Sequence, residues 1–366
     1  MNMQIPENRK ISPFFAFILI YANQIGIGIL TFQRLISKEA GYDAWISILM
    51  TGVCAHFIVW MIVKMLGTVE GDILSVHEFV FGKWAAKIAG IVFIIYLGLG
   101  MITVLRSYIE IVQVWMFPRL QTFWFALVFL FLVLYVVTGG FRVLTGMAFI
   151  SSVLSVYVFF IFLFALPYAN FANLLPILDH SFTDLLKGSR TMAFSFTGFE
   201  LILFYYPFLK KPEKVQKWAQ LAIAVCTVLY LYLTVITFAY FPEAQIQKNI
   251  WPSLTIWKII EMPFLERFEY IGVATWCLVI LPNVCIPLWA ASRLAKHVFS
   301  IRQRTAVPVF ALLCLIAVSM ISTRKQINFL ASITGTMGFY IDFVYLPLIF
   351  LATLLAKKVK KSGPSS

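Results

Sequence analysis

Charged residues are scarce in this sequence. Only 12% of its 366 residues are Asp, Glu, Lys or Arg, whereas 61% are hydrophobic, and the mean hydropathy is +0.90. Soluble domains carry about 25% charged residues, so the composition excludes a soluble globular protein. It is typical of a polytopic membrane protein, and the whole chain, 1–366, is expected to form a single transmembrane domain.

Patterns that hold metals or form disulfides are missing as well. The four histidines are scattered without ligand spacing, and the five cysteines all lie in apolar runs: Cys54, Cys226, Cys277, Cys285 and Cys314. In such runs a cysteine behaves as a small hydrophobic residue. The sequence therefore predicts no metal site and no cofactor. It also shows no nucleophile–base pattern, so an enzyme is not expected.

Ten apolar runs are each long enough to cross the hydrocarbon core of a bilayer, which is about 30 Å thick. Because spanning segments without a closed barrel must be helical, the sequence predicts an all-α fold with about ten transmembrane helices. The first run is too long for the core of a signal peptide and is expected to be a retained span. The expected spans are 11–36, 42–66, 85–115, 121–139, 142–167, 187–208, 214–241, 268–297, 306–322 and 326–356.

Lysine and arginine are distributed unevenly over the two sides that these spans define. Eighteen of the 29 fall on the side of the N-terminus and ten on the other, with Arg106 inside a span. Cytoplasmic loops are enriched in Lys and Arg, so both termini are expected in the cytoplasm, the C-terminal one as a basic tail at 357–366. The net charge of +13 is attributed to topology and to membrane lipid headgroups, and nucleic acid is not an expected partner.

Two of the ten runs carry glycine near their middle. The first contains Gly26-Ile27-Gly28 and the sixth contains Thr197-Gly198, followed by Glu200. Each glycine costs about 1 kcal/mol relative to alanine inside a helix. The first and sixth runs hold matching positions in two five-helix halves, about 11–167 and 187–356. Paired interruptions of this kind predict an inverted-repeat transporter fold with its binding site at the bilayer midplane.

A helix broken at half depth exposes N–H and C=O groups that can hold the carboxylate and the amine of a ligand. Glycines in membrane helices also serve close packing, but the matching positions favour a site. Asn283, between two prolines of the eighth run, is a further candidate. The role of Glu200 stays open between a clamp on the unwound backbone, a partner for an amine and a proton carrier. The candidates from the two breaks are Gly26, Ile27, Gly28, Phe196, Thr197, Gly198 and Glu200.

Other ionisable residues lie inside the spans. Arg106 and Glu110 are four residues apart in the third run, on one helix face. Such a pair can neutralise itself in the membrane, so we expect a mutual ion pair or a role in an outer gate. Asp342 in the tenth run is expected in an interior polar network.

The motifs carry a resemblance to a known family. Gly26-Ile27-Gly28-Ile29 and Phe196-Thr197-Gly198-Phe199-Glu200 resemble the broken-helix motifs of the amino acid–polyamine–organocation superfamily. Three further stretches resemble the B subunit of spore germinant receptors, and this resemblance covers essentially the whole chain. They are Trp251-Pro252-Ser253, Phe264-Leu265-Glu266-Arg267-Phe268-Glu269 and Phe208-Leu209-Lys210-Lys211.

The resemblance implies a LeuT-like 5+5 inverted repeat with helices 1 and 6 broken. It also implies a protein of the inner spore membrane that works with A and C subunits and senses amino acids or sugars. In the resembling fold the third helix faces the broken first one. Tyr96 and Gly100, one helical turn apart in that run, are therefore candidate ligand contacts, although Tyr96 fits a core aromatic equally well.

A proton-coupled amino acid permease is the alternative function. A sodium site would need hydroxyls or a carboxylate on the eighth helix, where the sequence offers only the Asn283 amide. A proton-coupled relative often has a lysine in the fifth helix, where this chain has Ser151, Ser152 and Ser155 instead. The sequence thus offers few groups that could bind a sodium ion or a coupling proton. This favours a sensor over an active transporter.

Overall fold

A computed structural model describes residues 5–260 and 267–362 of the chain. Helices account for most of the described residues, and one isolated β-bridge joins Ile11 to Leu209. The α-helices are α1 (Phe14–Gln24), α2 (Phe32–Ala40), α3 (Ala44–Val69), α4 (Ile73–Phe81), α5 (Lys83–Trp115), α6 (Thr122–Thr138), α7 (Phe141–Ser155), α8 (Tyr157–Leu163), α9 (Phe182–Phe196), α10 (Ile202–Tyr205), α11 (Val215–Tyr240), α12 (Glu243–Ile246), α13 (Pro252–Trp257), α14 (Phe268–Phe299), α15 (Gln303–Met320), α16 (Arg324–Tyr340) and α17 (Leu346–Ser362). Short 3-10 turns include η2 (Ile27–Leu30), η6 (Phe199–Leu201) and η7 (Tyr206–Phe208), and η9 (Ile341–Tyr345) is a π-helical turn.

All ten predicted runs contain helix, within a few residues of the expected bounds. Among the described residues, seven helical stretches are long and apolar enough to cross a membrane. Three shorter apolar helices accompany them, at Phe14–Gln24, Thr122–Thr138 and Phe199–Phe208. Two of these three are short because the first and sixth runs are interrupted at their glycines. The prediction of an all-α polytopic membrane fold is therefore confirmed.

Large apolar side chains cover the outward faces of the helices. Phe57 on α3, Ile88 on α5 and Phe131 on α6 are between 61% and 63% exposed. A soluble protein rarely exposes a continuous apolar surface of this kind. In a bilayer these side chains meet acyl chains, which are as apolar as they are.

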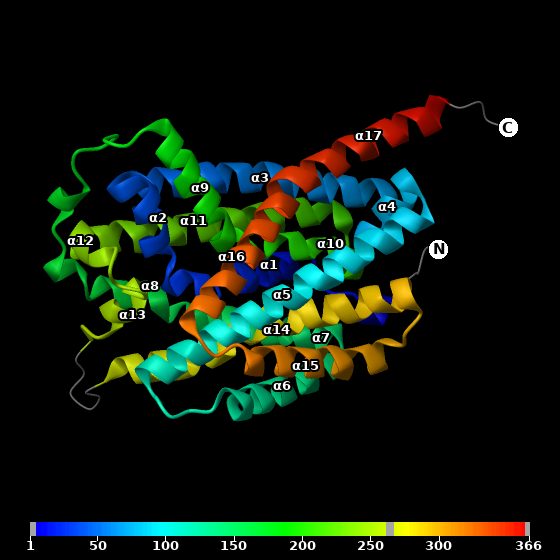
Figure 1. The fold of residues 1–366 in the computed structure, drawn as a ribbon. Helices are drawn as coiled ribbons and strands as arrows, with labels where there is room; N and C mark the ends of the chain where they lie inside the picture. The colour runs from blue at the N-terminus through cyan, green and yellow to red at the C-terminus, as the bar shows by residue number, and fades with distance from the viewer. Residues whose placement is uncertain (1–4, 261–266, 363–366) are drawn as a thin grey trace.

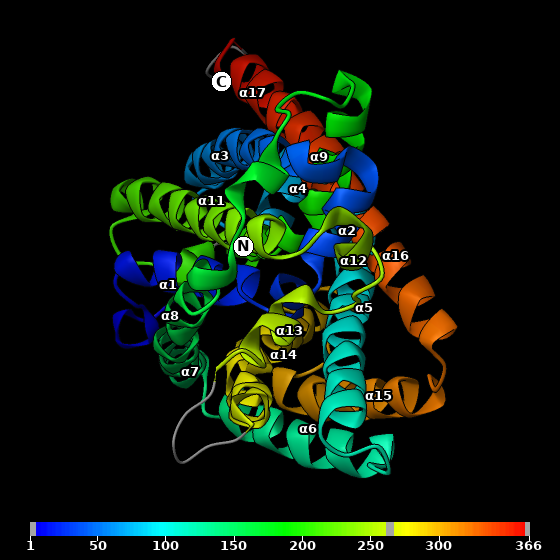
Figure 2. The ribbon, with the colours of Figure 1, turned by 90° about the vertical axis from the view of Figure 1, so that its left-hand side faces the viewer.

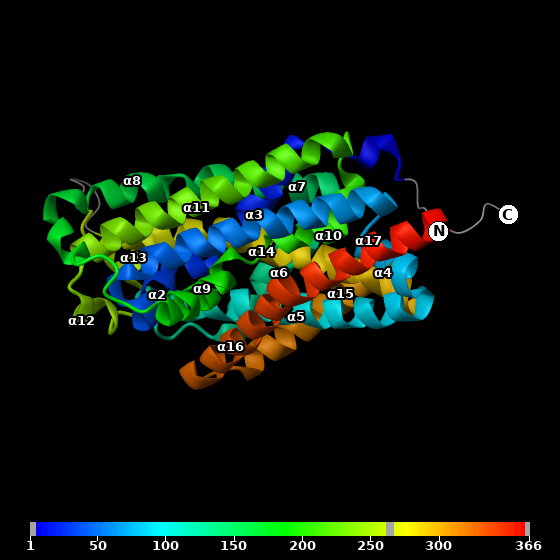
Figure 3. The ribbon, with the colours of Figure 1, turned by 90° about the horizontal axis from the view of Figure 1, so that it is seen from above.

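The helices run mostly along one common direction (Figure 1). Both chain termini lie at the right-hand end of Figure 1, near α4, whereas α12 and α13 lie at the opposite end. Seen along this direction, α14 lies in the interior, and it packs against α5, α7 and α15 (Figure 2). Figure 3 shows α3 and α11 side by side along one flank. Because both termini lie at the same end of the bundle, the chain crosses the membrane an even number of times, as the ten predicted spans require.

The two interrupted spans are antiparallel neighbours. The first consists of α1, η2 and α2, and the sixth of α9, η6, α10 and η7. The second half of the first span, α2, packs against the first half of the sixth, α9, and α1 packs against η6. The chain therefore brings the two breaks together near the middle of the bundle.

A pair of backbone hydrogen bonds ties these two spans at the end that carries the termini. The Ile11 N–H donates to the Phe208 carbonyl (2.8 Å), and the Lys210 N–H donates to the Ile11 carbonyl (2.8 Å). The bridge joins the beginning of the first span to the end of the sixth. Movement of one broken span at this end must therefore break the bridge or carry the other span with it.

The expected ion pair between Arg106 and Glu110 is wrong. The Nε of Arg106 donates to the Ile321 carbonyl (2.6 Å), and Glu110 pairs with Arg324 at the start of α16. The carbonyl of Ile321 follows the end of α15, where the helix provides no partner for it. The sequence spacing shows which residues share a helix face, but the neighbouring helices supplied better partners.

The motif Trp251-Pro252-Ser253 opens α13, with Pro252 in the first turn. A proline is tolerated there because its missing N–H has no partner in the first helical turn. Of the second motif, Phe264, Leu265 and Glu266 lie outside the described residues.

Candidate functional site

The first break follows Gln24, the last residue of α1. Ile25 (ψ 78°) and Gly26 (φ −124°, ψ −143°) leave the helical conformation before η2 begins. A Cβ atom on Gly26 would lie 2.9 Å from Nδ2 of Asn283. Glycine leaves room here for the Asn283 amide from α14, which a larger residue would have to displace.

The second break centres on Gly198, which has φ +120° and ψ −25°. Residues with a side chain rarely adopt such a positive φ. A Cβ atom on Gly198 would also lie 2.7 Å from Cβ of Asn23, beside the first break. Both the dihedral angle and the close contact between the two breaks thus demand glycine.

Hydrogen bonds join the two breaks to each other and to the surrounding helices. The side-chain amide of Gln24 donates to the Phe196 carbonyl (2.7 Å). From α14, the side-chain amide of Asn283 donates to the Asn23 carbonyl (2.7 Å). A carbonyl released from a helix at membrane depth needs such a partner. Each break is therefore a defined element of the fold that is stabilised by specific side chains.

Glu200 binds the unwound backbone directly. Its Oε2 accepts the N–H of Gly198 (2.5 Å), and its Oε1 accepts the hydroxyl of Tyr96 from α5 (2.8 Å). The carboxyl group is almost fully buried. Hydrogen bonds to a charged acceptor are roughly twice as strong as those between neutral groups. Among the three roles considered for Glu200, this geometry fits a clamp that holds the unwound backbone at Gly198.

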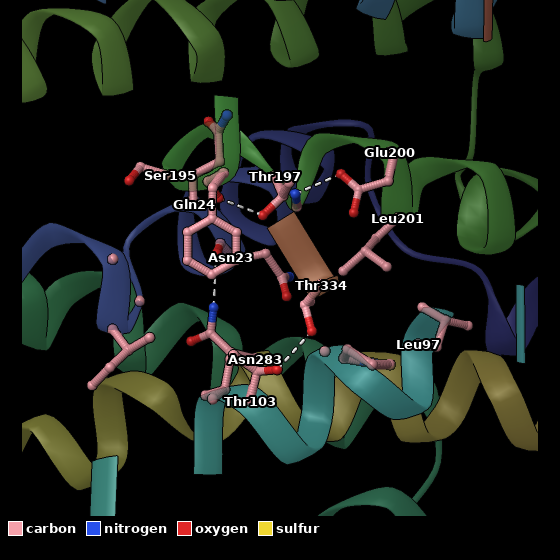
Figure 4. Close-up of a pocket in the computed structure, with 18 of the residues that line it drawn as sticks. Asn23, Gln24, Leu97, Thr103, Ser195, Thr197, Glu200, Leu201, Asn283 and Thr334 are labelled. Carbon is pink, nitrogen blue, oxygen red and sulfur yellow. Dashed lines mark hydrogen bonds between the residues drawn. The ribbon is translucent and has the colours of Figure 1, made fainter. Parts of the chain in front are cut away.

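A cavity lies between the two breaks and is closed by α5, α14 and α16 (Figure 4). Its volume is about 100 Å³. Nine of the ten residues predicted from the sequence line it: Gly26, Ile27, Gly28, Tyr96, Gly100, Thr197, Gly198, Glu200 and Asn283. Phe196 does not, because its ring packs against Tyr230 and its carbonyl is bound by Gln24.

Several lining residues were not expected from the sequence. Asn23, Gln24 and Ser195 flank the breaks and face the cavity, as do Thr103 from α5 and Thr334 from α16. The hydroxyls of Thr103 and Thr334 lie 2.8 Å apart. The polar pair Asn23-Gln24 at the middle of an apolar run was a usable signal. Isolated threonines on two other helices gave none, since threonine often bonds its own helix.

Two side chains of the cavity wall carry buried hydrogen-bond acceptors. Oε1 of Gln24 and Oδ1 of Asn283 are buried and have no partner among the described residues, and both side chains line the cavity. A buried acceptor without a partner is costly, and a ligand that donates hydrogen bonds removes that cost. Ile27, Leu97 and Leu201 add an apolar wall. The cavity suits a compact ligand with a donor group, such as an ammonium or a hydroxyl, and a small apolar part.

Solved transporter structures share this fold. Mhp1, a nucleobase-cation-symport-1 family transporter in a closed conformation with bromovinylhydantoin bound, matches with a TM-score of 0.64 at 12% identity, over 97% of this chain and 93% of that one. MhsT in complex with L-phenylalanine matches with a TM-score of 0.57 at 14% identity, over 93% of this chain and 98% of that one. These likenesses concern the fold. The fold and the paired breaks define a membrane protein of the LeuT-like class.

The family follows from the sequence comparisons. A family model described as "Spore germination protein" matches residues 10–329. Spore germination protein GerQB of Bacillus cereus is 42% identical over 358 residues, which cover 98% of this chain and 99% of that protein. The chain belongs to the spore germination protein family.

Proposed function

We propose that this chain is the B-type subunit of a spore germinant receptor and that it binds a small nutrient, an amino acid or a sugar, in the cavity between the two helix breaks. The observation that carries the proposal is the set of unpartnered acceptors on Gln24 and Asn283 beside the glycine breaks. The small volume of the cavity favours a compact ligand over a drug-sized one, for which sites of roughly 300–1,000 Å³ are usual.

Binding becomes a signal through the contacts that cross the breaks. The ligand occupies the space between α5, α14 and the two broken spans, and it favours the arrangement of these elements that fits it best. The shift can be no larger than the difference between the ligand's affinities for the two arrangements. The β-bridge between Ile11 and Leu209 couples the motion of the two spans at the end that carries the termini.

We also propose the inner spore membrane as the location, with both termini in the cytoplasm and with A and C subunits as partners. The excess of Lys and Arg on the terminal side supports this orientation. The family's role in germination supports the location and the partners.

Two glycines of α5 provide a test of the site. A Cβ on Gly100 or on Gly98 would meet no atom within 4 Å, but only Gly100 lines the cavity. Leucine at position 100 should therefore fill the cavity without disturbing the fold, and Gly98→Leu is the matched control. The full chain in lipid nanodiscs is screened with the twenty L-amino acids and a set of monosaccharides, and its thermal unfolding midpoint is recorded.

A compound that binds the native state raises the midpoint. At least one compound should do so for the wild type and for Gly98→Leu, and not for Gly100→Leu. An equal rise in the unfolding midpoint of all three proteins would show that the compound binds outside this cavity. No rise with any compound would overturn the proposal that the ligand is an amino acid or a sugar. Accumulation of a labelled amino acid in proteoliposomes under a proton gradient would favour the permease instead.

A further inference from the structure

Asp342 is a buried carboxyl group that the nutrient site does not use. It lies in the π-helical turn η9 of the tenth span, and its side chain is fully inaccessible to solvent. Neither of its carboxyl oxygens has a hydrogen-bond partner among the described residues. An ionised carboxylate in this position would bear the full cost of desolvation. Single π-helical turns within α-helices occur frequently at functional sites.

The tenth span packs against the second break just beside this group. Gly338 precedes Asp342 by one helical turn, and a Cβ on Gly338 would lie 3.0 Å from Cγ2 of Thr197 and 3.4 Å from the hydroxyl of Tyr96. Tyr96 in turn donates to Glu200. Asp342 is near enough to Glu200 for the two charges to act on each other, so two acids share one buried region.

The other titratable groups around this turn are tyrosines or have partners of their own. Tyr96 lies close to both acids and Tyr205 close to Glu200. Within the turn itself, the hydroxyl of Tyr345 bonds Nε2 of His77 on α4 (2.6 Å). On α3, which also packs against η9, His56 bonds Gln220 of α11 and Lys64 lies over the ring of Trp60. Within the described part of the chain, the ion pairs contain neither Glu200 nor Asp342.

We propose that Asp342 is a proton-binding site, which holds one proton at neutral pH while Glu200 carries the negative charge. Glu200 is the member that stays ionised because it accepts two hydrogen bonds, whereas Asp342 accepts none from the part of the chain that the structure describes. Binding joins a proton from water to one Asp342 oxygen and gives a neutral carboxyl, and release returns the proton to water. No other reactant is needed.

A proton fits this position better than a metal cation. Sodium or calcium ions need several oxygen ligands around them. The oxygens of Glu200 are already engaged by Gly198 and Tyr96, and Asp342 does not line the central cavity. The proposal stands whether or not that cavity binds a nutrient.

Release of the proton would place a second negative charge beside Glu200. Like charges in a region of low dielectric repel strongly, and Glu200 holds the N–H of Gly198. Deprotonation of Asp342 therefore acts directly on the second helix break. With a proton-binding site here, the conformation of the two broken spans depends on pH independently of ligand binding.

Infrared spectroscopy of the full chain in nanodiscs tests this site, because a protonated carboxyl has a carbonyl stretch well separated from carboxylate bands. The wild type should show this band at neutral pH, and Asp342→Asn should lack it. Glu200→Gln should keep it, since the proton is not on Glu200. Glu213→Gln, at an exposed carboxyl in the loop before α11, is the matched control and should also keep it.

An unchanged band in Asp342→Asn, or loss of the band in Glu200→Gln alone, overturns the proposal. Where Asp342→Asn does not fold, wild-type protein labelled with ¹³C at the aspartate carboxyl decides, since only an aspartate band shifts. A sodium-dependent rise in the unfolding midpoint, present in the wild type and absent in Asp342→Asn, would assign the site to a metal cation instead.

Discussion

The hydroxyl of Tyr230 lies 2.7 Å from the carbonyl oxygen of Gln24, at the end of the first helix segment. The same hydroxyl lies 2.9 Å from the carbonyl oxygen of Ser195, near the end of α9. One phenol from α11 thus serves both breaks at once. A hydroxyl has a single proton, so the two carbonyls share it, and the contact depends on the two breaks keeping their present separation.

Removal of this hydroxyl should destabilise the protein. Tyr230→Phe keeps the ring and leaves two buried carbonyls without their donor, which costs about 1–3 kcal/mol. Thermal or chemical unfolding in bicelles measures the loss. Tyr232→Phe is the control, because Tyr232 bonds the Phe159 carbonyl at a more exposed position of the same helix. Equal losses in the two variants would contradict a special role of the shared contact.

Gly198→Ala should destabilise the protein through its backbone. The positive φ of Gly198 strains any residue with a side chain, at a cost of about 1–3 kcal/mol, and the new Cβ would meet Asn23. At Gly146 in α7, a Cβ would meet nothing within 4 Å. Gly146→Ala should therefore gain up to about 1 kcal/mol from helix propensity. Comparable midpoints for the two variants would show that the second break tolerates ordinary residues.

A double-mutant cycle separates the two possible partners of Glu110. The cycle of Glu110→Gln with Arg324→Gln should give a coupling energy of about 0.5–1 kcal/mol, since this pair is in contact and Arg324 is partly exposed. The cycle of Glu110→Gln with Arg106→Gln should give a smaller value, because Arg106 donates to the Ile321 carbonyl. A larger coupling energy in the second cycle would show that Glu110 pairs with Arg106 within α5.

Ser253 of α13 covers the first break at the end of the molecule opposite the termini. Its hydroxyl donates to the Ile29 carbonyl (2.9 Å) and accepts the side-chain amide of Gln33 (2.8 Å). Ser253→Ala removes both bonds, so the amides of η2 should exchange with deuterium faster. Ser319→Ala is the control, because that hydroxyl bonds a carbonyl of its own helix, that of Leu315. Unchanged exchange in η2 would show that α13 does not hold the break.

The architecture could be read from the sequence because its signals are local. Apolar runs long enough to span a bilayer must form helices, since hydrocarbon offers the backbone no other partner. The glycines at 26, 28 and 198 weaken those helices wherever they stand in the fold. Their matching places in the chain predicted the paired breaks and six residues of the cavity, whereas Tyr96 and Gly100 came from the family resemblance and Asn283 from its place between two prolines.

Contacts between helices required the tertiary structure. Sequence spacing paired Glu110 with Arg106, whereas the partner is Arg324, more than two hundred residues further along the chain. Thr103 and Thr334 meet across the cavity, although each alone resembles a threonine bonded to its own helix. Phe196 was expected at the ligand and is instead packed against Tyr230. A helix face is set by local periodicity, but the element opposite it depends on how all the helices pack.

The sequence by itself determined the membrane class, the helical spans and the places where two of them break, because these depend on hydropathy and backbone conformation within one segment. Only the tertiary structure decided what supports the breaks. It brought Tyr230, Asn283 and Glu200 to the freed backbone groups and left the carboxyl oxygens of Asp342 without a hydrogen-bond partner within residues 5–260 and 267–362. Such partners come from separate helices, and their distances are fixed only when the helices pack together.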